Sequence, residues 1–225
     1  MIRFAIAIAA FAVGVNALSA DRAKLSLKTD QLDPPKELAK ALKPEFDTEA
    51  FVVGEGDTDS MTFWFRKEIP AKASAEQLEN GLTYREIPEG TLVGIVQFEK
   101  AFVDFRKQEI PAGTYTLRIA VQPDTGDHKD TAPHSDFVLL SLVADDKSSE
   151  AVEVKDLVRR SIKVTGSDHP AVMLLFPHFG KEQDAKLDAK ENGVTCLRLK
   201  RAVKAGDSKA MLGFSIVVAG FSKTR

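Results

Sequence analysis

The sequence predicts an all-β fold, namely an antiparallel β-sandwich of the jelly-roll or immunoglobulin-like kind with one or two short helices. Three observations support this prediction. In several segments apolar and polar residues alternate, as they do in a strand with one buried face. Other short runs are apolar on both faces, which is typical of interior strands. Turn signals with proline and glycine separate these segments and no linker divides them, so one sandwich domain is expected over residues 61–225.

Residues 1–20 have the features of a signal peptide. Arg3 supplies a positive charge, an uncharged apolar run covers residues 4–15, and small residues follow up to Ala20. Cleavage is expected after Ser19, with Ala17 and Ala20 as alternative positions. An uncleaved membrane anchor is less favoured, because a span needs roughly 20 apolar residues and this run is shorter. We therefore expect a periplasmic or secreted protein with no transmembrane segment after cleavage.

Residues 21–60 are predicted to form an N-terminal segment with one short helix. Asp33 stands before two prolines, where a capping residue is expected, and apolar residues follow at helical spacing. Pro44 should end this helix, because proline interrupts helical hydrogen bonding. The sandwich itself is then expected to begin at Met61.

Within the sandwich domain, the alternation is strongest over residues 114–121. Apolar residues take the odd positions there, and Thr114, Thr116 and Arg118 take even ones. Residues 61–66 alternate in the same way. The runs that are apolar on both faces are residues 137–143, 171–176 and 214–219. We expect interior strands at these runs, although a buried helix would show the same pattern over so short a length.

A hairpin is predicted around Asn192 and Gly193. This dipeptide stands between residues 186–189 and 194–200, and it is typical of two-residue hairpin turns. The second predicted strand contains Cys196, which is the single cysteine of the chain. No intrachain disulfide can therefore form, and we expect Cys196 to be a small buried thiol rather than a nucleophile.

One longer helix is expected over residues 151–164. Apolar residues recur there at helical spacing, which predicts a stripe that packs against a sheet. Ser149 is the expected N-cap, and Gly166 stands where a left-handed glycine would end the helix.

Composition limits the class of partner. The formal net charge is −2, and acidic and basic residues are mixed along the chain. A nucleic-acid partner would require a concentrated basic face, and the best basic cluster, residues 200–209, is expected to be a solvated rim. We therefore expect no nucleic-acid partner.

The chain has 14 Phe but 2 Tyr and 1 Trp. This composition favours aromatic residues that fill the core over flat aromatic platforms that stack on sugars.

The polar connection of residues 122–136 is the most unusual segment, because it is too long for a plain hairpin and carries two of the 4 histidines. Such loops on a rigid sheet often bind ligands. The candidate binding residues are Asp127, His128, His134 and Asp136. A divalent transition metal is the candidate cofactor, since imidazole and carboxylate groups coordinate such ions. Its candidate ligands are His128, His134, Asp136 and His178. The favoured interpretation, however, is that these side chains only shape the loop.

Several phrases around this connection resemble a group of uncharacterised exported bacterial proteins. They are Gly-Thr-Tyr-Thr-Leu-Arg at residues 113–118, Gln-Pro with Gly-Asp-His at 122–128, Asp-Phe-Val-Leu-Leu at 136–140 and Asp-His-Pro-Ala-Val at 168–172. The resemblance carries no established activity, so no catalytic residue can be transferred. It implies only that the His128 loop and the corner at His169 and Pro170 belong to a shared scaffold.

No complete catalytic motif occurs in the sequence: there is no nucleophile elbow, zinc-protease helix, phosphate-binding loop or dinucleotide fingerprint. We therefore expect a non-enzymatic β-sandwich with a binding or structural role at the cell envelope. Its envelope or extracellular ligand would lie near residues 122–136. An alternative is a metal-binding protein or metal-dependent enzyme that uses His128 and His134. A third interpretation is a glycan-binding module with Trp64 and Tyr84 as stacking rings.

Overall fold

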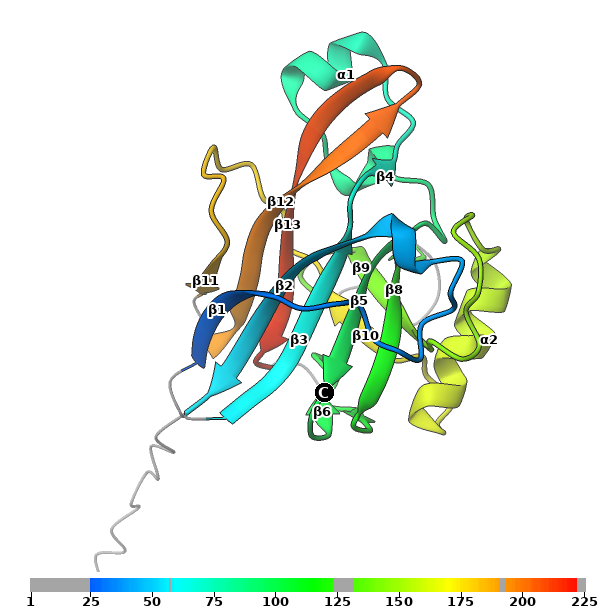
Figure 1. Ribbon diagram of the computed structural model, residues 1–225, viewed down its shortest axis with the longest axis vertical. Helices are drawn as coiled ribbons and strands as arrows, with labels where there is room; N and C mark the ends of the chain where they lie inside the picture. Colours follow the sequence, from blue (N-terminus) through cyan, green and yellow to red (C-terminus); the bar gives the residue numbers. More distant parts are fainter. Residues whose placement is uncertain (1–24, 57, 124–131, 191–192, 222–225) are drawn as a thin grey trace, which may run out of the picture.

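The computed structural model describes residues 25–56, 58–123, 132–190 and 193–221. Two mainly antiparallel sheets pack face to face there, accompanied by two short helices, α1 (Ala75–Asn80) and α2 (Val154–Thr165). The predicted all-β sandwich is therefore confirmed. Figure 1 shows α2 beside the larger sheet, while α1 lies near the far end of the smaller one.

The larger sheet has seven strands in the order β1-β2-β3-β5-β8-β9-β10, and each neighbouring pair is antiparallel. These strands are β1 (Leu25–Gln31), β2 (Phe46–Glu55), β3 (Thr58–Arg66), β5 (Leu92–Phe98), β8 (Gly113–Val121), β9 (Asp136–Leu142) and β10 (Val172–Leu174). The predicted strands at residues 61–66, 114–121, 137–143 and 171–176 all lie in this sheet.

The N-terminal segment differs from the prediction, because β1 and β2 are part of the sandwich sheet. The helix expected after Asp33 does not form. Turns replace it, followed by a 3-10 helix, η1 (Lys43–Glu45), and Pro44 lies in the first positions of η1 instead of ending a helix. Leu38 and Leu42 are buried with Trp64, so these apolar residues cover the sheet.

The smaller sheet contains the long hairpin of β12 (Thr195–Ala205) and β13 (Ser208–Ala219). β11 (Lys186–Ala189) pairs antiparallel with β12, and β4 (Ile69–Pro70) pairs with β12 in parallel. The predicted hairpin before residue 194 is confirmed, since Lys186 lies opposite Arg198 and Gly193 has φ 74°. A separate pair joins β6 (Phe102–Val103) to β7 (Glu109–Ile110).

The main core lies between the two sheets and is rich in phenylalanine, as the composition predicts. Phe63 and Phe65 of β3 stack with ring centroids 6.2 Å apart, and the ring centroid of Phe214 of β13 lies 6.0 Å from that of Phe65.

Cys196 is buried, and burial raises the pKa of its thiol. A thiol with a raised pKa is a poor nucleophile, which agrees with the predicted inert role.

The outer face of the larger sheet is covered as well. β8 alternates as predicted, but Thr116 and Arg118 are fully buried there rather than half-exposed. Arg118 forms a two-point ion pair with Asp146, with Nε–Oδ2 at 2.6 Å and Nη2–Oδ1 at 2.8 Å. The backbone carbonyls of Gly90, Ser148 and Glu150 accept its remaining N–H groups. All five guanidinium donors are thus satisfied.

The helix α2 starts later in the chain than the sequence predicts. Its N-cap is Glu153, which makes no side-chain capping bond, rather than the predicted Ser149. The Ser149 carbonyl instead accepts a hydrogen bond from Arg66 at 3.2 Å, in the segment that wraps around Arg118. The predicted end of the helix is confirmed, because Gly166 adopts the left-handed conformation with φ 62°.

Candidate functional site

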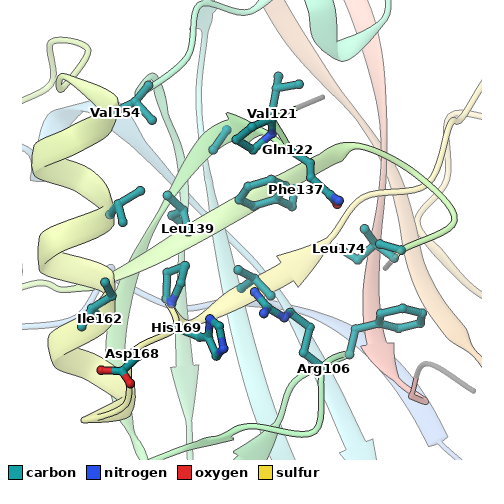
Figure 2. A pocket seen from close by; sticks show the side chains of 17 residues that line it. Arg106, Val121, Gln122, Phe137, Leu139, Val154, Ile162, Asp168, His169 and Leu174 are labelled. Carbon is teal, nitrogen blue, oxygen red and sulfur yellow. The ribbon is translucent and has the colours of Figure 1, made fainter. Parts of the chain in front are cut away.

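The candidate site is a pocket of about 370 Å³ between α2 and the outer face of β8, β9 and β10 (Figure 2). Its volume falls within the range of small-molecule sites. Most of the side chains that line it are apolar: Phe105, Ala120, Val121, Pro123, Ala132, Phe137, Leu139, Val154, Val158, Ile162, Pro170, Val172 and Leu174. The exceptions are Arg106, Gln122, Asp168 and His169.

Helical and strand periodicities position the two main walls. Val154, Val158 and Ile162 are four residues apart on α2, so they project from one face of the helix. Phe137 and Leu139 alternate along β9 and face α2, while Val138 between them points into the main core. The helix and the sheet pack closely around Leu157, which is fully buried. The pocket lies beside this contact.

Two segments singled out in the sequence meet at this pocket. The described ends of the 122–136 connection contribute Gln122, Pro123 and Ala132, and the corner after α2 contributes His169 and Pro170. The sequence phrases at residues 122–128, 136–140 and 168–172 thus include residues that line one cavity.

Hydrogen bonds tie the corner after α2 to the turn that carries Arg106. Gln108 Nε2 donates to the Pro170 carbonyl at 3.1 Å, and Ser167 Oγ donates to Gln108 Oε1 at 2.9 Å. Asp104 holds the turn, since its Oδ1 accepts the backbone N–H groups of Arg106 and Gln108, each at 2.9 Å. Burial raises the pKa of Asp104. This network fixes the polar rim of the pocket relative to its apolar walls.

The residues predicted for binding fall outside this pocket or outside the described part of the chain. Asp127 and His128 lie beyond the described residues. His134 packs edge-on against the Phe176 ring, with centroids 4.4 Å apart, and burial lowers the pKa of its imidazole. Asp136 Oδ1 lies 3.2 Å from Arg85 Nε in an ion pair whose geometry makes no hydrogen bond. Burial raises the pKa of Asp136, although Arg85 and His134 act in the opposite direction.

His178 lies in a smaller pocket of about 210 Å³, which Asp136 also lines. Its Nδ1 accepts a hydrogen bond from Arg198 Nη2 at 2.8 Å, which requires the neutral imidazole. Burial, followed by the Arg198 charge, lowers the pKa of His178. Within the described ranges, no group of three or more His, Cys, Asp or Glu side chains lies close enough to hold a metal ion. The predicted metal site includes His128 and stays a prediction.

The two rings predicted for glycan stacking are inaccessible. Trp64 and Tyr84 each expose 4% of their surface. Trp64 Nε1 donates to the Leu32 carbonyl at 3.0 Å, while the Tyr84 hydroxyl donates to the Phe176 carbonyl at 2.9 Å. Both side chains are core residues with satisfied polar tips, so the assignment of these rings as a sugar platform is wrong.

Three members of the basic cluster at residues 200–209 are paired with acidic side chains. Arg201 binds Asp47 and Glu49 of β2, and Glu68 binds Lys204 and Lys209.

Among the described helices, none has the length and apolar character needed to cross a bilayer.

The sequence drew attention to the 122–136 connection, whose described ends line the pocket, but it gave no sign of most of the other lining residues. Arg106 lies in a turn that carries no motif. The apolar stripe on α2 was predicted to pack against a sheet. The spacing of its residues does not show whether the space against the sheet is filled by side chains or leaves a pocket.

Comparison of the chain with protein-family models, with curated proteins and with solved structures gives no match.

Proposed function

We propose that this chain is an exported, non-enzymatic binding protein of the cell envelope whose ligand occupies the pocket between α2 and the larger sheet. The observation that carries this proposal is the pocket itself, which has mainly apolar walls and a small polar rim. Small-molecule sites have this combination, in which apolar walls supply affinity and a few polar groups set orientation. The pocket also lies at the ends of the 122–136 connection, where a ligand is expected from the sequence.

Binding of a neutral apolar fluorophore, 1-N-phenylnaphthylamine, tests the proposed pocket. We expect saturable binding of one molecule per chain, because the probe moves apolar surface out of water. Val158→Trp should abolish this binding by filling the space between the helix and β9. Met211→Trp is the matched control, since Met211 is 46% exposed on β13 and does not line the pocket. Unchanged binding by Val158→Trp would show that the probe binds elsewhere.

Export is tested on the full-length chain expressed in a bacterium with a secretory pathway. We expect the protein in the periplasm or medium, with a mass that corresponds to cleavage after Ala17, Ser19 or Ala20. An Arg replacing Ala9 in the apolar run should block this processing, because the run would no longer be uncharged. An intact N-terminus on cytoplasmic protein would contradict the export part of the proposal.

A further inference from the structure

The rim of the pocket carries a fixed positive charge. Among the described lining residues, Arg106 is the single lysine or arginine. Figure 2 shows its side chain extending from the rim into the pocket, toward His169 and the side chains of the sheet. An arginine guanidinium keeps its charge at every physiological pH and presents a planar array of N–H donors.

The Arg106 guanidinium forms no salt bridge with an acidic side chain among the described residues, although its charge acts on the nearby Asp104 carboxyl and tends to lower its pKa. The backbone N–H of Arg106 donates a hydrogen bond to Asp104 Oδ1. The Asp104 carboxylate is directed at its own turn, where it also accepts from the backbone and side chain of Gln108. Asp104 therefore does not form an ion pair with the guanidinium, which is left available to a ligand.

The remaining polar groups of the rim are compatible with an anion beside Arg106. The imidazole of His169 lies next to Arg106 in Figure 2 and can supply a further N–H donor. The lining carboxylate belongs to Asp168, and in this view it lies on the far side of His169 from Arg106. The corner that carries both residues is fixed, because Thr165 Oγ1 donates to the His169 carbonyl at 2.7 Å and Ser167 Oγ accepts the His169 backbone N–H at 3.1 Å.

We propose, on the basis of the proposed function, that the ligand is an amphiphile with a single carboxylate head group and an apolar body. The carboxylate pairs with Arg106 at the rim, and the apolar body lies between Val158 of α2 and Leu139 of β9. A carboxylate matches the planar guanidinium in shape and charge, since it accepts two parallel N–H bonds. One cation balances one negative charge, whereas a doubly charged phosphate head would need further cations.

Calorimetric titration with three ligands of equal chain length tests the head group: decanoate, decan-1-ol and decylammonium. We expect decanoate to bind about fivefold more tightly than decan-1-ol, because an ion pair with an exposed arginine is worth up to about 1 kcal/mol. Decylammonium should bind most weakly, since its charge repels Arg106. Raising the salt concentration should weaken decanoate binding and leave decan-1-ol binding unchanged.

Arg106→Met removes the charge while keeping an unbranched side chain of similar reach. We expect this variant to lose about fivefold in decanoate affinity and to bind decan-1-ol as the native protein does. Arg159→Met is the matched control, because Arg159 lies on α2, has 66% of its side chain exposed and does not line the pocket. Equal affinities of the native protein for decanoate and decan-1-ol, or no effect of Arg106→Met, would overturn the inference.

The outcomes separate this inference from the proposed function. Binding of decan-1-ol that is abolished by Val158→Trp, without a preference for decanoate, would keep the pocket and reject the carboxylate. Failure of all three ligands and of the neutral fluorophore to bind would reject both.

Discussion

Replacing Asp146 by asparagine should lower the free energy of unfolding by about 3–5 kcal/mol, because the substitution leaves the Arg118 charge uncompensated in the interior. Both side chains of this ion pair are 0% exposed, and the remaining N–H groups of Arg118 donate to backbone carbonyls. Thr116 also donates to Asp146 at 2.7 Å, so the carboxylate holds two neighbouring side chains of β8. Chemical denaturation of the native protein and the variant measures the difference.

A surface ion pair on the same side of the molecule provides the control. Arg159 and Asp156 pair on α2 with 66% and 46% of their side chains exposed. Arg159→Gln should therefore cost less than about 1 kcal/mol. A loss below about 1 kcal/mol for Asp146→Asn would mean that water reaches Arg118.

Gly90→Ala should destabilise the fold by about 2–5 kcal/mol, the sum of left-handed backbone strain and overpacking. Gly90 has φ 79°, and a Cβ placed there would lie 1.9 Å from the Val152 carbonyl oxygen. The backbone cannot easily move away, because the Gly90 carbonyl accepts hydrogen bonds from Arg118 and from Val152 N. The substitution therefore acts on the same buried cluster from its other side.

Gly206→Ala isolates the contribution of backbone strain. Gly206 has φ 60° in the turn between β12 and β13, and a Cβ there would meet nothing within 4 Å. We expect this variant to lose about 1–2 kcal/mol, measured by the same denaturation experiment. Equal losses for the two glycine variants would show that Val152 moves aside without cost and that the contact does not limit the fold.

The elements that the sequence predicted correctly depend on local patterns. Alternation over residues 114–121 predicted β8, and the left-handed Gly166 ended α2 as expected. Arg118 could not be predicted as a buried residue, because its burial depends on Asp146, 28 positions along the chain. β2 was missed for a related reason. Its N-terminal half mixes charged and apolar residues, and burial of Phe46 and Ala50 depends on a segment that crosses the sheet.

The candidate site likewise depends on contacts between distant parts of the sequence, which local patterns do not predict. The connection of residues 122–136 was identified from its length and polarity, and its described ends do line the pocket. The pocket, however, needs Arg106, the α2 stripe and the corner at His169, which come from separate parts of the sequence. His134 and His178 are conspicuous in the sequence because histidine is rare in this chain. In the structure they are held by Phe176 and Arg198 away from this pocket.

The central claim is that a ligand binds between α2 and the outer face of the larger sheet. Isotope-filtered NOE spectra of the protein with bound decan-1-ol test it most directly, because they report which methyl groups touch the ligand. We expect contacts from the ligand chain to Val158, Ile162 and Leu139. Contacts confined to residues outside the pocket, such as the exposed Phe179 or Met211, would contradict the claim.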